Sequence, residues 1–320
     1  ATASLPDLRL AMLGMVDGNG HPYSWSAIFN GYNPEAMAAC PYAGIPDYLN
    51  KEPKDTLRIR GARVTHVWCD DPADSALVAR ASLVPQVVAT PEAVIGQVDA
   101  VIVATDKGGE HVARCRPFVE AGLPVFVDKP LCDNLADLRT FNQWVAEGRV
   151  LLSSSCMRYA KEFLPYRLST NELGDLRLAT ITTAKSWERY GIHALEAIYP
   201  ILGPGFTSIR LSGDTQRAVA HLTHARGADA VVVVSYDMLG GFGLLTLAGT
   251  KGAVSTQFKD SFFAFKAQLQ AFVDFLRSGQ RPFPWAETEE LMLLVAGGIR
   301  SRVQGGQVVF LADLRAELAR

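Results

Sequence analysis

Residues 99–130, DAVIVATDKGGEHVARCRPFVEAGLPVFVDKP, decide the fold of this chain. They begin with Asp99–Thr105, a short apolar run without helical periodicity, as expected of a strand buried on both faces. Gly108–Gly122 then places apolar side chains three and four residues apart and predicts a helix, and Val125–Val127 predicts the next strand. Because strand–helix–strand units are right-handed and parallel, Thr105 and Lys129 are expected together at the carboxyl edge of the sheet, where open α/β folds bind ligands.

The composition limits the function. With 320 residues the chain has room for two domains, and 20% charged and 48% hydrophobic residues are typical of a soluble globular protein. A net charge of -2 gives no reason to expect a nucleic acid or an anionic membrane as partner. The five scattered cysteines contain no CxxC pair, which favours reduced thiols over disulfides or a metal site. No apolar run is long enough to span a bilayer and residues 1–4 do not resemble a signal peptide, so a cytoplasmic protein is expected.

Upstream, Leu8–Met15 predicts the first buried strand, followed by Gly14, Gly18 and Gly20. Their spacing departs from the G-x-G-x-x-G of dinucleotide-binding turns, so a phosphate-binding turn and a tight structural loop both remain open. Tyr23–Phe29 is expected to be the first helix, with Ser24 as a candidate N-cap. The proline-rich stretch Gly31–Arg60 is expected to be either a functional loop over the site or a surface elaboration with short helices.

The second strand, Arg63–Cys69, ends in Asp70 and Asp71. An acid at this place accepts hydrogen bonds from the adenosine ribose and repels a 2′-phosphate. Two carboxylates with no adjacent arginine therefore favour NAD over NADP as the cofactor. The alternative is that both acids cap the helix Ala73–Ser82. Both readings hold together if Asp70 lies at the ribose while Asp71 or Asp74 caps the helix.

Strands and helices continue to alternate up to the predicted strand Val150–Ser155, which completes a doubly wound half. Beyond it, Gly205–Phe258 reads as several strands joined by turns. The predicted fold is therefore α/β: a Rossmann-type parallel sheet over residues 1–155, then a domain over 156–320 with a large, mostly antiparallel open sheet.

The strand, Ala-Thr, helix, strand and Asp-Lys-Pro succession resembles the Gfo/Idh/MocA family of nicotinamide-dependent oxidoreductases, with Asp128 where the family has glutamate. The resemblance implies that Lys129 touches both the cofactor and the substrate. It also implies a set of cofactor-binding residues: Gly14, Gly18, Gly20, Asp70, Thr105, His111, Asp128, Lys129 and Pro130. Arg158 and Tyr159 resemble the family's Arg-Tyr segment at the entry to the second domain and are candidate substrate residues.

A second motif lies at residues 190–196, YGIHALE, and resembles the family pattern D-x-G-x-H-x-x-[DE]. His193 matches the acid/base histidine, and Tyr190 and Glu196 become candidate substrate residues. Arg189 stands where the family has an acid, four residues before the histidine and on the same helical face. Either the substrate carries a carboxylate or phosphate that pairs with Arg189, or Arg189 pairs with Glu188, Glu196 or another nearby acid.

These residues predict an NAD-dependent oxidoreductase that transfers hydride between nicotinamide and a hydroxyl or keto carbon. The resemblance implies a sugar, inositol or sugar acid as substrate, and a homodimer or homotetramer formed across the open sheet. Two alternatives remain: a redox-cycling lyase or glycosidase that uses bound NAD, and a non-catalytic cofactor-binding homologue. The irregular glycine turn and Arg189 favour the latter.

Overall fold

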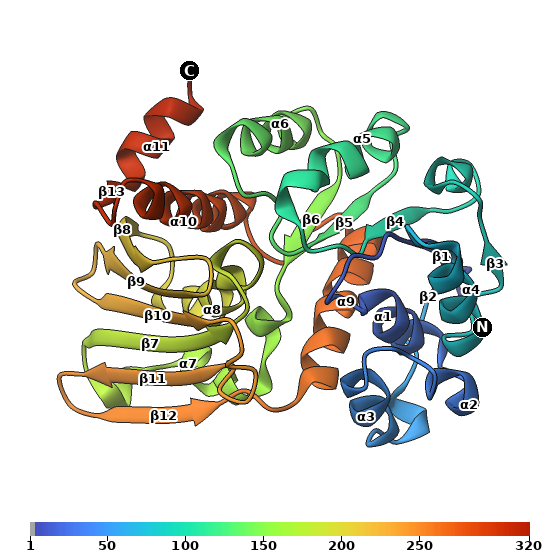
Figure 1. The fold of residues 1–320 in the computed structure, drawn as a ribbon, viewed down its shortest axis with the longest axis horizontal. Coiled ribbons are helices and arrows are strands. Elements are labelled where there is room, and N and C mark those ends of the chain that lie inside the picture. The colour runs from blue at the N-terminus through green and yellow to red at the C-terminus, as the bar shows by residue number, and fades with distance from the viewer. Residues whose placement is uncertain (1–3) are drawn as a thin grey trace.

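The computed structural model describes residues 4–320, so Ala1–Ala3, which bear on the expectation of no signal peptide, lie outside it. Two sheets organise the chain (Figure 1). The first is six-stranded, parallel throughout and ordered β3-β2-β1-β4-β5-β6. Its strands are β1 Leu8–Leu13, β2 Ala62–Trp68, β3 Gln86–Val87, β4 Ala100–Val103, β5 Val125–Asp128 and β6 Leu151–Ser154. The predicted doubly wound half is confirmed.

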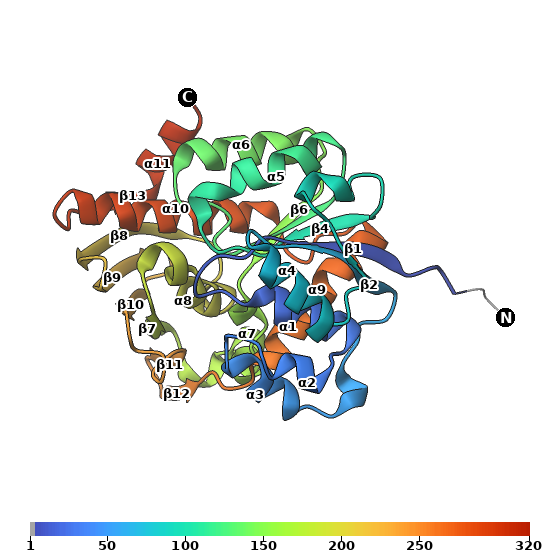
Figure 2. The same ribbon diagram turned by 45° about the vertical axis from the view of Figure 1, so that its right-hand side comes forward.

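Helices cover both faces of this sheet (Figure 2). Side chains alternate along the strands, so Val101 and Val103 pack with α5 and α6 on one face while Ile102 joins the core on the other. The helices of this half are α1 His21–Asn30, α2 Pro34–Met37, α3 Gly44–Asn50, α4 Pro72–Ala81, α5 His111–Glu120 and α6 Leu135–Ala146. Short 3₁₀ segments lie at η1 Lys54–Thr56, η2 Pro91–Val94 and η3 Gly108–Glu110.

One helix from the C-terminal half packs against the first sheet. Helix α9, Ser261–Ser278, lies beside α1 in both views (Figures 1 and 2). Its Phe272 is fully buried against Phe126 of β5, with ring centroids 5.5 Å apart. Gln268 donates to the carbonyl of Ser154 at 2.6 Å. The predicted division near residue 155 thus separates the two sheets, but α9 completes the core of the first.

The second sheet has seven strands, ordered β12-β11-β7-β10-β9-β8-β13. All neighbours are antiparallel except β7 and β10, which confirms the mostly antiparallel prediction. Its strands are β7 Leu176–Ala184, β8 Phe206–Gly213, β9 Arg217–His224, β10 Asp229–Ser235, β11 Leu244–Gly249, β12 Ala253–Gln257 and β13 Val309–Phe310.

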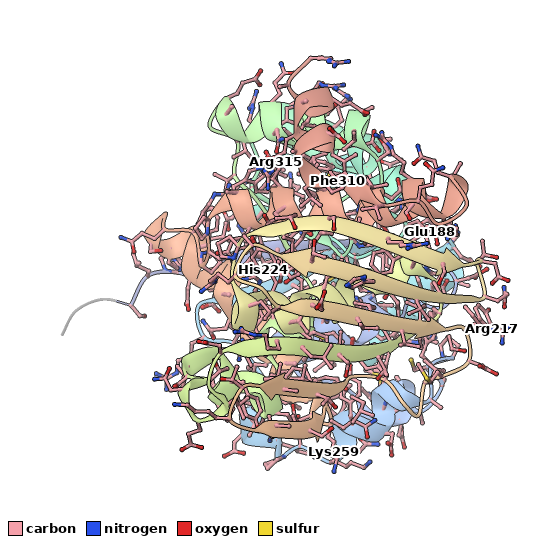
Figure 3. All side chains as sticks on the ribbon, turned by 90° about the vertical axis from the view of Figure 1, so that its left-hand side faces the viewer. Glu188, Arg217, His224, Lys259, Phe310 and Arg315 are labelled. Carbon is pink, nitrogen blue, oxygen red and sulfur yellow. The ribbon has the colours of Figure 1, made fainter. Side chains whose placement is uncertain are left out.

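Helices α8 and α10 cover one face of this sheet, and the other face is open to the viewer in Figure 3. The helices of this half are α7 Leu164–Leu168, α8 Trp187–Leu202, α9, α10 Trp285–Val303 and α11 Leu311–Leu318. The 3₁₀ segments are η4 Cys156–Tyr159, η5 Lys161–Phe163 and η6 Asn171–Leu173.

Two local expectations need correction or refinement. Helix α1 begins at His21, with Gly20 as an N-cap that forms no side-chain hydrogen bond, so the prediction of Ser24 as N-cap is wrong. Ser24 is fully buried inside the helix. The stretch Gly31–Arg60 contains the short segments α2, α3 and η1, as the surface-elaboration alternative expected. In the described residues 4–320, no helix combines the length and hydropathy of a membrane span.

Candidate active site at the edge of the first sheet

Three charged side chains from both sheets meet at the carboxyl edge of the first sheet. Asp106 follows β4 and is fully buried. Its Oδ2 lies 3.3 Å from Lys129 Nζ at the end of β5, and its Oδ1 lies 2.5 Å from Arg189 Nη2 in the first turn of α8. One carboxylate therefore joins the two parallel strands to the helix of the second sheet.

This ion triad fixes the charge of its members. Burial by itself would raise the pKa of Asp106, but Lys129 and Arg189 outweigh burial and hold the pKa well below its ordinary value. Burial would lower the pKa of the Lys129 ammonium, but Asp106 and Asp128 overcome this and raise it. Lys129 is therefore a charged ammonium at neutral pH although only 2% of its surface is exposed.

Helix α8 brings the second predicted motif to this triad. Ser186 caps the helix through the backbone N–H of Arg189, so Tyr190 lies in the first turn and His193 follows one turn later. The Lys129 ammonium lies 4.4 Å from the centre of the Tyr190 ring, and the His193 ring meets Tyr190 edge-on at 4.6 Å. The structure thus brings Lys129 and His193, the two predicted catalytic residues, together across one aromatic ring.

His193 is held in place by a neutral partner. Its Nδ1 lies 2.6 Å from the hydroxyl of Ser155. Burial, followed by the positive charge of Lys129, lowers the pKa of His193 well below its ordinary value. The imidazole is therefore uncharged at neutral pH and can accept a proton.

Asp128 lies directly beneath Lys129 and is fully buried. Its Oδ2 accepts from the Asn19 amide at 2.9 Å and lies 2.7 Å from His21 Nδ1. The His21 ring stacks on Trp25 at 4.2 Å. Asp128 thus anchors the start of α1 to the end of β5, and the cis Lys129-Pro130 bond follows directly.

The predicted ribose acid lies at the other end of the sheet edge. Asp70 accepts from the Met15 backbone N–H at 2.9 Å. It also accepts from Arg114 of α5 at 3.1 and 2.8 Å, and Arg114 in turn reaches Glu110. The premise that no arginine lies beside Asp70 is wrong, because the fold brings Arg114 from 44 residues away. Burial would raise the pKa of Asp70, but the Arg114 and Met15 bonds lower it.

The alternative for Asp70 and Asp71, that both cap the next helix, is resolved by position. Only Asp71 caps α4, accepting from the Ala73 N–H at 2.9 Å. Asp70 instead faces the turn after β1, where it accepts from the Met15 N–H, and its role at the ribose stays a prediction.

The described residues fit a dinucleotide at its adenosine end. A cavity of about 230 Å³ has Leu13, Trp68, Val103 and Arg114 in its lining, and Arg114 pairs with Asp70. Gly14 has φ 90°, and a Cβ there would lie 2.7 Å from Thr105 Cγ2. Glycine is thus required at this position, and the approach of its backbone to a nucleotide stays a prediction.

The glycine turn itself runs differently from a dinucleotide-binding turn. Residues 14–20 separate β1 from α1, and Val16 and Asn19 pair as a tight hairpin. Gly18 has φ 79°, and a Cβ at Gly20 would strike Tyr42. The irregular spacing therefore encodes a longer, folded turn, whose role at the pyrophosphate stays a prediction.

The remaining predicted residues lie at different depths. Thr105 and His111 are buried, and the His111 ring nitrogens lie 2.8 Å from the Thr105 carbonyl and 2.9 Å from that of Leu131. Arg158 is buried between Glu196 at 2.9 Å and Glu287 at 3.1 Å. Their roles at the cofactor and the substrate stay predictions. Tyr159 is partly buried, and burial raises the pKa of its phenol.

Arg189 forms an ion pair with an acid of the protein itself, but this acid is neither Glu188 nor Glu196. Glu188 pairs with Arg302 and Glu196 with Arg158, while Arg189 pairs with Asp106. Sequence reasoning also missed Asp106. The signal for Asp106 was its place directly after Thr105, where β4 ends at the ligand edge.

This arrangement defines a class of protein. It is a two-sheet α/β protein in which the carboxyl edge of a Rossmann-type parallel sheet meets a helix that covers the second sheet. Residues 38–155 match the model of an oxidoreductase family with an NAD-binding Rossmann fold, the Gfo/Idh/MocA family. This part of the chain is similar to that family. The match begins after the glycine turn, so the unusual turn lies outside it.

Solved structures share the whole fold. A probable dehydrogenase from Thermotoga maritima has a TM-score of 0.73 at 16% identity, covering 96% of this chain and 100% of that one. A scyllo-inositol dehydrogenase from Lactobacillus casei, solved with NAD(H) and scyllo-inositol, has 0.72 at 13%, covering 96% and 99%. An oxidoreductase from Agrobacterium radiobacter, solved with NAD+, L-tartaric acid and magnesium, has 0.73 at 18%, covering 96% and 99%. No curated protein matches the chain by sequence.

The ion triad makes a pH-dependent contribution to stability. Because folding lowers the pKa of Asp106 below its ordinary 3.8, its charge stabilises the fold above about pH 4, and this contribution is lost as the pH falls further. We expect Asp106→Asn to lower the free energy of unfolding by about 3 kcal/mol or more at pH 7, because two buried cations lose their carboxylate. Urea unfolding at several pH values measures this. The difference in the free energy of unfolding between wild type and variant should become smaller below about pH 4.

The exposed Asp55 provides the control, since Asp55→Asn removes a carboxylate without a recorded partner in the described residues. A gap between wild type and Asp106→Asn that stays constant from neutral to acid pH would contradict the role of the Asp106 charge.

Proposed function

We propose that the protein transfers hydride between NAD and a hydroxyl- or keto-bearing carbon of a small carbohydrate-like substrate. The observation that carries this proposal is the pairing of a buried, charged Lys129 with an uncharged His193 across Tyr190. Oxidation of an alcohol releases one hydride and one proton, so the site needs a hydride acceptor and a proton acceptor. Bound NAD supplies the hydride acceptor.

The chain's own residues supply the rest. The Lys129 ammonium can donate a hydrogen bond to the reacting oxygen and stabilise the negative charge that develops on it. His193, oriented by the Ser155 hydroxyl, can accept the hydroxyl proton or return it in the reverse direction. Gly14, Asp70 and the cavity beside Trp68 would hold the adenosine end. Among the predicted substrate residues, Arg189 belongs to the triad and the Tyr190 ring lies beside Lys129.

A second candidate function is a redox-cycling lyase or glycosidase. One observation favours it: His21, 2.7 Å from the buried carboxylate of Asp128, is a second imidazole at the end of the strand that carries Lys129. Elimination requires a second proton transfer besides the one that accompanies hydride transfer. A single-turnover measurement separates the two, because a dehydrogenase releases NADH and a redox-cycling enzyme regenerates NAD.

Replacing Lys129 tests the proposed chemistry. We expect Lys129→Ala to reduce turnover by about 10²–10³-fold, because a preorganised donor to the reacting oxygen is lost. NADH fluorescence with NAD and a panel of inositols, sugars and sugar acids provides the measurement. Lys107→Ala is the matched control, since Lys107 is an exposed lysine on the loop after β4. Near-normal turnover of Lys129→Ala with an unchanged melting temperature would contradict the assignment.

The cofactor preference can be tested at Asp70. We expect tighter binding of NAD than of NADP, because the two negative charges of Asp70 and Glu110 exceed the single positive charge of Arg114 at the predicted 2′-position. Asp70→Ala should reduce this preference, because it removes a negative charge that repels the 2′-phosphate. Arg114→Ala should increase it, because it removes a positive charge that attracts the 2′-phosphate. Fluorescence titration with both dinucleotides measures the ratio, and equal or tighter NADP binding by the wild type would refute the preference.

We also propose that two or more copies associate through the open face of the seven-stranded sheet. Val219 on β9 is 45% exposed and Leu244 on β11 is 42% exposed, although both lie in regular strands. We expect a dimer or tetramer by light scattering at micromolar concentration, shifted toward monomer in Val219→Lys because a charge would be buried. A monomeric wild type would contradict the association.

A further inference from the structure

Two cations from the second sheet reach across to the glycine turn of the first. Lys185 directly follows β7, and its Nζ lies 2.7 Å from the carbonyl oxygen of Gly18. Arg189 Nη2 lies 2.8 Å from the carbonyl oxygen of Asp17. Both acceptors on the turn are neutral, although both donors carry a full charge. A carboxylate or phosphate would form stronger, charge-assisted hydrogen bonds with the same two donors.

Both side chains are held in place at a cost. Lys185 has φ 56°, a left-handed conformation that is unfavourable for a residue with a Cβ. Arg189 Nε is buried and has no hydrogen-bond partner within the described residues 4–320. Strained backbone and an unmatched buried donor cluster at functional sites, and here they occur four residues apart beside the ion triad.

The charges around Tyr190 are unbalanced. The Lys129 and Lys185 ammonium groups lie 4.4 and 4.5 Å from the centre of its ring, and Arg189 is the residue before it. Within the described residues, Asp106 is the one carboxylate that pairs with the side chains of these three cations, and it pairs with Lys129 and Arg189. Asp128 lies beneath them, but its carboxylate is occupied by His21, Asn19 and the Lys129 N–H. The Asp17 side chain is exposed on the outside of the turn. An additional anion would therefore be attracted to this place.

We infer that Lys185 and Arg189 form a binding site for an anionic group of the substrate, a carboxylate or a phosphate. The carbonyl oxygens of Asp17 and Gly18 occupy the two donors until that group arrives. The inference rests on the proposed function, because it places the anion beside Lys129 and His193 and so orients the reacting carbon. It assigns the substrate class as hydroxy acids of the sugar-acid type or sugar phosphates, and it makes the glycine turn the cover of the site.

Calorimetric titration of the full-length chain, saturated with NAD and at constant ionic strength, tests the site. The probes are L-tartrate and D-glucuronate as carboxylates, D-glucose 6-phosphate as a phosphate, and D-glucose and myo-inositol as neutral partners. We expect at least one anion to bind about tenfold or more tightly than its neutral partner, since one charge-assisted contact is worth about that factor. The carboxylate and phosphate arms show which anion the site prefers.

Lys185→Met should lose about tenfold or more in anion affinity and leave the affinity for the neutral ligands within about twofold. Arg189→Gln should lose anion affinity as well. Lys107→Met, which removes an exposed lysine from the loop after β4, is the control and should retain the preference. Circular dichroism melting of each variant shows that the fold is intact.

Two outcomes would overturn the inference. One is that the wild type binds the neutral ligands as tightly as the anions. The other is that the Lys185 and Arg189 variants lose affinity for NAD and ADP-ribose to the same extent as for the anions, which would make the cofactor's own phosphates the ligand. Absence of any NAD binding by the wild type would contradict the proposed function instead, and the anion preference of the apoprotein can then be measured by the same titrations.

Discussion

The buried carboxylate of Asp106 is the contact on which the arrangement of the site depends. It lies at the end of β4, pairs with Lys129 at the end of β5, and reaches Arg189 on α8 of the second half. Removing one partner from such a buried ion pair typically costs about 3–5 kcal/mol, since the remaining charge has neither water nor a counterion. The triad therefore keeps Lys129 charged and also fixes the position of α8, and hence of His193, relative to the sheet edge.

The same principle recurs on each side of the triad. Beneath it, Asp128 gathers His21, Asn19 and the backbone of Lys129, so the long glycine turn is tied to the strand that carries the lysine. Farther from it, Arg158 is buried between Glu196 and Glu287 and stacks on Phe283 at 3.8 Å. Each of these buried charges is paired within its own half of the protein, whereas the described residues give Lys185 only a neutral carbonyl and a ring as partners.

The alternation of buried strands and periodic helices could be read from the sequence up to residue 155, because burial on both faces leaves continuous apolar runs and helices leave a 3.6-residue period. The Asp-Lys-Pro corner and the His193 motif were likewise visible, since their residues are close together in the chain. Strand ends in a parallel sheet converge by topology, so Thr105 and Lys129 could be placed together without coordinates.

What depended on the tertiary structure were the partners of these residues. Arg114 reaches Asp70 from 44 positions away, Asp106 takes Arg189 from 83 positions away, and Lys185 meets Gly18 across 167 positions. Helix α9 crosses back to the first sheet for the same reason: its apolar face matches a surface that the first half alone leaves uncovered. Local sequence determines which elements form and which side chains they present. Which charges meet is decided by packing between distant segments, because a buried ion pair carries no sequence period by which it could be recognised.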